Sequence, residues 1–271
     1  IELHGLHISP DIDIVTYTLA GIVGERGWGV RGDTFRCLEM LREYGRETWF
    51  NLGDADLATH IDRTYLRGRG LTLSEITERH RRALGLKVRI LPMTDDRFET
   101  HILTDRGEMH FQEYLVKRGA ADAVLGVSFE GADAARPAPG VIESIMDSGG
   151  VVVCPSNPVV SIGTILAVEG VREALRRTDA RVAAVSPIVG GAPIKGPADK
   201  LMRGLGMDVS AYGVAELYRD FLDVFVIDEV DEDQRPRIEA LGLSVVVTDT
   251  VMRSLEDKVR LAKTVLEALL Q

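Results

Sequence analysis

The sequence predicts an α/β protein with a Rossmann-like, doubly wound and mostly parallel sheet. The half after about residue 148 repeats the order strand, loop, helix, which is typical of a parallel sheet covered by helices. Its strands, such as residues 151–154, are short continuous apolar runs, as expected for strands buried on both faces. The first half instead combines helical patterns with a few strands, and we interpret it as a helical and β insertion into that sheet.

The predicted Rossmann-like nucleotide-binding core covers residues 139–271. Its strands are expected at residues 151–154, 181–185, 224–228 and 244–248, and its helices at 163–177, 197–205, 214–219, 232–241 and from 254 onward. Apolar residues recur at helical spacing in the last helix. This spacing predicts that one face packs inward, comprising Leu255, Val259, Leu261, Ala262, Val265, Leu266 and Leu269.

The predicted insertion covers residues 25–138, within a single α/β domain of residues 1–271. Helical patterns occupy residues 12–23, 34–44 and 57–67, and strands are expected at 87–91, 99–103 and 109–116. A further helix is predicted to begin at Thr72, because Thr72 and Glu75 have the spacing of a capping box. Residues 118–139 are rich in Gly, Ala and Asp and form the expected boundary.

Composition excludes several classes of partner. The 42 acidic and 32 basic residues give a net charge of −10, which argues against a nucleic-acid partner. Cys37 and Cys154 lie far apart in helix-like and strand-like runs, which indicates reduced thiols in a cytoplasmic protein. No apolar run approaches the ~18 residues of a membrane span, so no membrane association is expected.

Residues 155–163 form a candidate ligand loop, because ligands of parallel sheets bind outside the carboxyl ends of the strands. Ser156, Asn157 and Ser161 supply short polar side chains beside a predicted helix N-terminus, which suits an anion or the edge of a base. A rigid turn capped by serine explains the same residues about equally well.

Residues 186–197 form a second candidate loop after the next strand. Gly190 and Gly191 would let the backbone approach a phosphate closely, and Lys195 or Lys200 would neutralise its charge. The loop lacks the residue order of a Walker loop, and no strand leads into G-x-G-x-x-G. This second absence counts against an NAD-dependent enzyme, which would need that motif in a segment before Ile1.

Asp11 and Asp13 follow Pro10 at the start of a predicted helix. Two carboxylates one residue apart suit a hard divalent cation such as Mg²⁺, which prefers oxygen ligands. An ordinary helix cap by Ser9 or Asp11 explains the pattern too, and spacing alone favours the cap.

Residues 51–60 form a third polar cluster. Gly53 is predicted to form a turn, and Asp54 or Asp56 is predicted to cap the helix that carries His60. Asp56 and His60 are four residues apart, so both can project from one helix face. A capped helix with a polar face is the simpler interpretation, and a pocket mouth formed by Asp54 and His60 is the functional one. Trp28, between two glycines, would either stack on a planar ligand or fill the core.

Seven segments, taken together and in this order, resemble the 2-phospho-L-lactate transferase family of deazaflavin coenzyme F-420 biosynthesis. The segments are residues 9–13, 51–60, 91–96, 109–114, 155–163, 186–188 and 213–216. The resemblance implies a Mg²⁺-dependent enzyme that transfers a phospholactyl or phosphoenolpyruvyl group from a guanosine-diphosphate-activated donor to the deazaflavin FO and releases GMP. It also implies a homodimer.

The resemblance further implies roles for individual residues. Asp13 matches the catalytic carboxylate of the metal and deazaflavin site, with Asp11 as a weaker metal ligand. Asn51, Asp54, His60 and Trp28 join Asp13 as expected deazaflavin contacts, although Asn51 replaces a Lys or Arg of some members. The expected nucleotide contacts are Ser156, Asn157, Pro158, Ser161, Pro187, Gly190 and Gly191.

Members of the family begin with a strand and a Gly-rich phosphate loop, about one βα unit plus a strand, or roughly 40 residues. We therefore expect a chain that starts at Ile1 to be inactive and poorly stable. The alternative function is a non-catalytic nucleotide-sugar-binding regulator of the related gluconeogenesis-factor family, for which residues 9–13 and 51–60 would not be needed.

Overall fold

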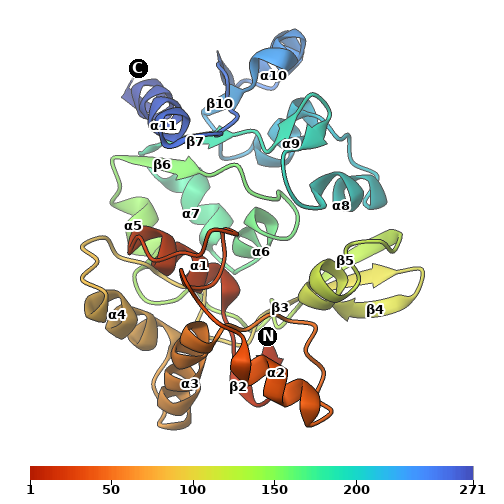
Figure 1. The fold of residues 1–271 in the computed structure, drawn as a ribbon. Coiled ribbons are helices and arrows are strands. Elements are labelled where there is room, and N and C mark those ends of the chain that lie inside the picture. The colour runs from red at the N-terminus through yellow and green to blue at the C-terminus, as the bar shows by residue number, and fades with distance from the viewer. Residues whose placement is uncertain (271) are drawn as a thin grey trace.

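The computed structural model describes residues 1–270. Four parallel strands form its central sheet in the order β11-β10-β7-β6, in the upper half of Figure 1. They are β6 (Gly150–Val153), β7 (Arg181–Val185), β10 (Val224–Ile227) and β11 (Ser244–Val247). Val226 at the centre of the sheet pairs with Val185 on one side and Val246 on the other. The predicted α/β class and all four predicted strands are confirmed.

Alternate residues of β7 and β10 face opposite layers of helices, as a doubly wound sheet requires. On one face, Ala183 and Val224 pack with Leu261 and Val265 of α11 (Leu255–Leu270). On the other face the core includes Phe225 and residues of three helices, α7 (Val171–Arg177), α8 (Ala198–Gly204) and α9 (Ala211–Tyr218). The remaining helical segments of this half are α5 (Val141–Met146), α6 (Ile162–Leu166), the 3-10 helix η2 (Glu229–Gln234) and α10 (Arg235–Glu239).

The first half of the chain forms four helices and a separate antiparallel sheet (Figure 1). The helices are α1 (Pro10–Leu19), α2 (Arg36–Glu43), α3 (Asp54–Gly68) and α4 (Leu73–Ala83), and a short hairpin of β1 (Glu2–Leu3) and β2 (Leu6–His7) precedes them. The sheet has the order β4-β3-β5 and consists of β3 (Glu99–Thr104), β4 (Gly107–His110) and β5 (Val124–Glu130), with the π-helix η1 (Glu113–Lys117) between β4 and β5. Thr72 and Glu75 form the predicted capping box of α4.

The two halves share one hydrophobic core. Ile102 of β3 and Tyr114 of η1 belong to the same buried cluster as Phe225 of the parallel sheet. At Gly204 of α8, an added Cβ would lie 2.4 Å from the carbonyl oxygen of Val124, so α8 and β5 are in close contact. The division at residues 25–138 and 139–271 stays a prediction.

The structure differs from four local predictions. Residues 87–91 form no strand, because both sides of β3 are already paired, with β4 and β5. The strand predicted at 109–116 ends at His110 and continues as η1, while β5 lies inside the segment interpreted as a boundary. The helix predicted at 163–177 is divided into α6 and α7 by Gly170, whose φ is 85°.

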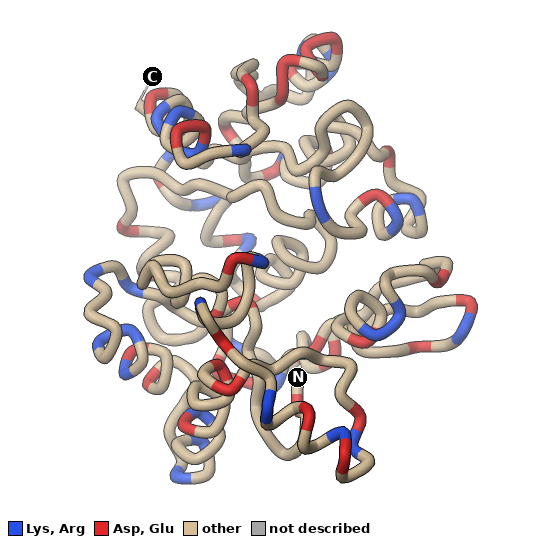
Figure 2. Tube along the Cα trace, viewed as in Figure 1, with Lys and Arg blue, Asp and Glu red and all other residues tan. Residues whose placement is uncertain are grey.

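The predicted inward face of α11 is correct only in part. Leu261 and Val265 are buried, whereas Leu255, Val259 and Leu266 are exposed. The helix therefore contacts the sheet through a narrower stripe than its apolar pattern predicts. Acidic and basic residues lie interspersed along both halves of the chain trace (Figure 2). No helix within residues 1–270 combines the length and apolar content that crossing a bilayer would need.

Candidate functional site

A cavity of about 680 Å³ lies between the first half of the chain and the carboxyl ends of the parallel strands. One wall comes from α1, α3 and the segments around Trp28 and Asn51. The opposite wall comes from the loops that follow β6 and β7 and from residues 250–252 after β11. Its position agrees with the rule that ligands of open α/β sheets bind beyond the carboxyl ends of the strands.

Most of the predicted site residues line this one cavity, although they come from distant segments of the chain. These residues are Asp11, Asp13, Trp28, Asn51, His60, Ser156, Asn157, Ser161 and Pro187. Four others, Asp54, Pro158, Gly190 and Gly191, do not line it.

Asp13 is held by a buried arginine that sequence reasoning missed. The two terminal nitrogens of Arg63 on α3 donate to the two carboxylate oxygens of Asp13, with Nη1 3.1 Å from Oδ2. Arg63 is 1% exposed and Asp13 5% exposed, so the pair is removed from water. Burial raises the pKa of Asp13, and the charge and hydrogen bonds of Arg63 oppose that rise. The arginine thus fixes the orientation of the carboxylate at the cavity wall.

His60 extends this buried polar network. Its Nδ1 lies 3.2 Å from Arg63 Nη1 and accepts from it, which leaves the ring proton on Nε2. Nε2 lies 3.3 Å from Asp56 Oδ2, as the spacing of four residues predicts, but has no aligned hydrogen-bond partner among the described residues. The Tyr17 hydroxyl donates to Asp56 Oδ1 at 2.8 Å, and burial raises the pKa of Tyr17, which keeps it a phenol. His60 Nε2 is therefore a buried nitrogen beside Asp56 that has no aligned hydrogen-bond partner among the described residues, on a histidine that lines the cavity.

Asp54 caps a helix and does not reach the cavity. Its carboxylate accepts from the backbone N–H groups of Arg36 and Cys37 at the start of α2, at 3.1 and 3.0 Å. The hydrogen bond from the Thr34 hydroxyl, followed by that from the Cys37 N–H, lowers the pKa of Asp54.

A second aspartate completes a reciprocal arrangement at the start of α3. Asp33 accepts from the backbone N–H groups of Ala55 and Asp56 at 2.7 and 3.0 Å, so it caps α3 from outside the helix. Gly53 is needed because a Cβ there would lie 2.0 Å from Asp33 Oδ2. The glycine therefore permits close approach of the cap, and the φ of −76° shows that no left-handed turn is involved.

The loop after β6 is a side-chain-capped turn whose polar face lines the cavity. Asn157 Oδ1 accepts from the backbone N–H groups of Val159 and Val160 at 2.9 and 3.2 Å. Its amide nitrogen remains as a donor at the cavity wall, next to Ser156 and Ser161. The turn interpretation and the binding interpretation thus apply to the same residues.

The loop after β7 uses its glycines for a hairpin. Gly190 and Gly191 connect β8 (Ile188–Val189) to β9 (Ala192–Pro193) with φ angles of 59° and 78°, as a two-residue primed turn requires. The Gly190 N–H donates to Asp231 Oδ2 at 3.0 Å. Beyond this hairpin the chain returns to the cavity at Lys195, the only Lys or Arg among the described residues that line it.

Lys195 and Trp28 both line the cavity. An added Cβ on Gly27 would lie 4.0 Å from Lys195 Nζ, so the lysine reaches the loop that carries Trp28. Trp28 is half-buried, meets Phe35 edge-on and has the Arg26 guanidinium 5.6 Å from its ring centroid. The cavity lining therefore combines an aromatic ring with a positive charge.

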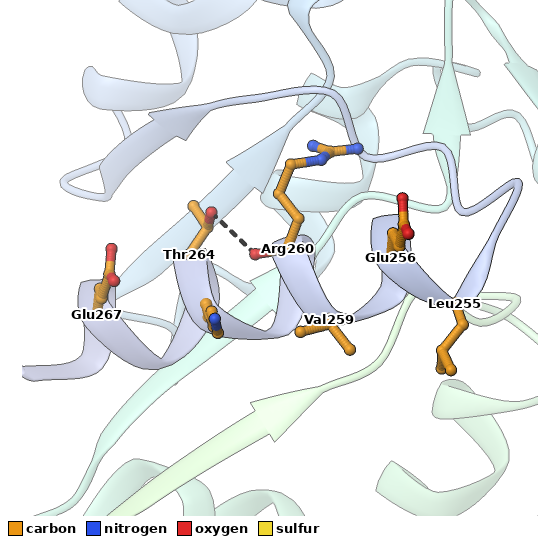
Figure 3. A pocket seen from close by; sticks show the side chains of 7 residues that line it. Leu255, Glu256, Val259, Arg260, Thr264 and Glu267 are labelled. Carbon is orange, nitrogen blue, oxygen red and sulfur yellow. Dashed lines mark hydrogen bonds between the residues drawn. The ribbon is translucent and has the colours of Figure 1, made fainter.

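A second groove runs along α11 and has a different character. Figure 3 shows that its labelled side chains, including Leu255, Val259 and Glu267, all project from one helix. Polar groups from different segments do not converge there, so the cavity beyond the parallel strands is the candidate functional site.

Comparison with known proteins identifies the family. Residues 1–265 match the sequence profile of 2-phospho-L-lactate transferase CofD. The chain belongs to this family. The 2-phospho-L-lactate transferase of Methanopyrus kandleri is 45% identical over 270 residues, which cover 98% of this chain and 85% of that protein. The phosphoenolpyruvate transferase of Kitasatospora aureofaciens is 43% identical over 273 residues, covering 98% of this chain and 85% of that protein.

A solved structure supports the fold independently of sequence. Protein BH3568 from Bacillus halodurans aligns with a TM-score of 0.59 over 94% of this chain and 85% of its own, at 14% identity. This chain is therefore a member of a transferase family on an α/β scaffold, and the resemblance inferred from its seven segments is confirmed.

Several cavity residues of this CofD-family protein escaped the sequence interpretation. They are Tyr17, Phe111, Gln112 and Thr250, together with Arg63 behind the wall. A signal for part of this set exists, because Asp56, His60 and Arg63 recur at intervals of four and three residues and therefore share one face of α3.

Proposed function

We propose that this CofD-family protein transfers a phospholactyl or phosphoenolpyruvyl group from a guanosine-diphosphate-activated donor to the deazaflavin FO in coenzyme F-420 biosynthesis. The observation that carries the proposal is the convergence on one cavity of the α1 carboxylates, the Trp28 ring and the polar loops after β6 and β7. A relative named 2-phospho-L-lactate transferase and one named phosphoenolpyruvate transferase match this chain almost equally well. We therefore propose that the donor carries either phospholactate or phosphoenolpyruvate.

In the proposed reaction, an oxygen of the FO ribityl chain forms a bond to the phosphorus that bears the three-carbon acid. The bond from that phosphorus to the oxygen of GMP breaks, and GMP leaves with the electron pair. The proton of the attacking hydroxyl passes to a carboxylate, which we assign to Asp13, because Asp13 lines the cavity and Arg63 holds it in place. His60 and Asn157, which both line the cavity, are assigned to orienting the acceptor and the nucleotide.

Phosphoryl transfer depends on charge neutralisation and positioning. Lys195 is assigned to the diphosphate, and the Trp28 ring to stacking against the planar deazaflavin. Ser156, Ser161 and Pro187 line the opposite wall and are assigned to the guanosine side of the donor.

Asp11 and Asp13 are the residues that would hold Mg²⁺. Both line the cavity, and Mg²⁺ is typically held by one or two carboxylates together with substrate phosphates and waters. Partial removal from solvent raises the pKa of Asp11, with repulsion from Asp13 adding to the effect. When bound, the ion would neutralise charge on the transferred group.

The test is an assay of the complete gene product with FO and each activated donor, in which GMP and the deazaflavin product are measured by mass spectrometry. We expect stoichiometric formation of both. Absence of FO binding in isothermal titration, combined with tight binding of a UDP-sugar, would instead identify the nucleotide-sugar-binding regulator. Analytical ultracentrifugation tests the proposed homodimer.

A further inference from the structure

The outer face of the antiparallel sheet carries a cluster of metal-ligating groups away from the cavity. Glu99 and His101 lie on β3, and Glu130 lies on β5 directly opposite Glu99. One donor atom from each of the three lies within 4.8 Å of the other two. None of these residues lines the cavity of the proposed transferase site.

Two of the three distances between donor atoms match a tetrahedral coordination shell, and the third is within 4.8 Å. His101 Nε2 lies 3.4 Å from Glu99 Oε2 and 3.4 Å from Glu130 Oε2. For bonds of about 2.0–2.1 Å to Zn²⁺, neighbouring donors of a tetrahedron are about 3.3–3.4 Å apart. The three atoms therefore occupy positions from which one ion can bind all of them after little movement.

The second carboxylate oxygen of each glutamate contacts Arg97. Arg97 Nε lies 3.1 Å from Glu99 Oε1, and Arg97 Nη2 lies 3.4 Å from Glu130 Oε1. Each glutamate thus directs one oxygen to Arg97 and the other to His101. Such partners of the ligands commonly orient them toward a metal.

The second nitrogen of His101 faces a further carboxylate. His101 Nδ1 lies 4.0 Å from Glu108 Oε1, and this oxygen accepts a hydrogen bond from the Ser128 hydroxyl at 2.9 Å. A carboxylate behind the distal nitrogen is the usual companion of a metal-binding histidine, because it keeps the proton on that nitrogen and a lone pair on the other. A metal ion bound here would take the Nε2 lone pair and replace the hydrogen bond that joins Nε2 to Glu99 Oε2 at 3.4 Å.

Like charges placed directly opposite each other on antiparallel strands destabilise a sheet. Glu99 and Glu130 form such a pair, and Arg97, their common partner, is a largely exposed side chain. A cation between the carboxylates and His101 would remove the repulsion.

We propose that Glu99, His101 and Glu130 bind a divalent transition metal ion, with Zn²⁺ the best match to one imidazole and two carboxylates. With three protein ligands, the fourth position is left for water. The half-buried Glu99 and His101 form the rigid part of the site, and the more exposed Glu130 closes it. The site is independent of the proposed transferase chemistry.

The test is isothermal titration of the metal-stripped complete gene product with ZnCl₂, in the presence of millimolar Mg²⁺ to occupy oxygen-only sites. We expect one Zn²⁺ per chain, with binding weakened at least about tenfold in both His101→Gln and Glu130→Gln. Titration with CoCl₂ should give the visible absorption bands of tetrahedral Co²⁺, and the two variants should lose them.

His80→Gln is the matched control, because His80 Nε2 also contacts a carboxylate, Asp62 Oδ2 at 2.8 Å, but outside any three-donor cluster of the described residues. This control should bind Zn²⁺ as the unmodified protein does. Circular dichroism establishes that each variant is folded. The proposal is overturned if Zn²⁺ does not bind, or if it binds equally to the unmodified protein and to folded His101→Gln. It is also overturned if ¹⁵N NMR shows His101 as a doubly protonated imidazolium bridging the two glutamates in the presence of Zn²⁺.

Discussion

Arg63 lies behind the cavity wall and holds Asp13, which lines the cavity, with both of its terminal nitrogens. The arginine lies on α3 and the aspartate on α1, 50 residues earlier in the chain. The carboxylate assigned to catalysis is therefore also a contact between two helices. Its removal affects chemistry and stability together.

We predict that Asp13→Asn lowers turnover on the order of 10²-fold and also destabilises the protein by about 3–5 kcal/mol, because it leaves the Arg63 charge buried without its partner. The stability effect is measured by urea unfolding. In the double variant Asp13→Leu with Arg63→Met, an apolar pair replaces both charges and should recover much of the loss while remaining inactive. An Asp13→Asn protein as stable as the unmodified one would show that the ion pair contributes nothing.

We predict opposite effects for two glycine substitutions on one helix. Gly53→Ala should destabilise the protein by about 1–2 kcal/mol, because its Cβ would collide with Asp33 and displace the cap of α3. Gly68→Ala is the control, because a Cβ at the last residue of the same helix meets nothing within 4 Å. It should stabilise by about 0.5–1 kcal/mol through helix propensity. Thermal unfolding measures both, and equal effects would contradict this account of Gly53.

We predict that the stabilising effect of Asp220 disappears in acid. Burial raises the pKa of Asp220, but hydrogen bonds from Arg172 and Arg176 together outweigh it and lower the pKa below 3.8. Because the pKa is lower in the folded state, the carboxylate stabilises the fold above about pH 4, and this contribution is lost as the pH falls through the folded pKa. Asp220→Asn should cost about 1.5–3 kcal/mol at pH 7. Urea unfolding of both proteins at a series of pH values from roughly 2 to 7 measures this loss of stability. A difference in unfolding free energy that stays constant over this range would refute the assignment.

We predict that Lys195→Ala weakens binding of the activated donor about tenfold, equivalent to about 1.4 kcal/mol, because it removes the only basic side chain among the described lining residues. The loss should shrink as salt is added, since an exposed charge is screened. Lys263→Ala, on the surface of α11, is the control and should bind donor normally. Isothermal titration at two ionic strengths provides the measurement. Donor binding that did not depend on salt in either variant, including Lys263→Ala, which keeps Lys195, would argue against a charge contact.

The sequence predicted features that depend on local pattern and missed those that depend on distant partners. The four parallel strands and the Thr72 capping box could be predicted because apolar runs and cap spacing are encoded within a few residues. β5 was missed because the small residues before it resemble a linker, and only pairing with β3 makes the segment a strand.

The candidate site shows the same division. Asp13 and Asn157 could be singled out because the family resemblance assigns them, whereas spacing alone favoured a helix cap at residues 9–13 and explained residues 155–163 about equally well as a turn. Arg63 was missed because an arginine on a helix is usually exposed, and only the tertiary position of α1 makes it buried. The Gly190–Gly191 pair was assigned to phosphate binding because a hairpin turn and a phosphate loop place the same demand on the backbone.

The exchange of caps between Asp33 and Asp54 bears on how the cavity opens. Asp33, shortly before α2, caps the N-terminus of α3, and Asp54, the first residue of α3, caps the N-terminus of α2. Both helices therefore lose their N-terminal caps together if the segment between residues 33 and 54 loosens. Asn51 lies inside this segment and Trp28 packs on Phe35 at its start. The aromatic and amide parts of the cavity wall should therefore form a single cooperative unit, which exchanges its amide hydrogens at one common rate, separate from that of the parallel sheet.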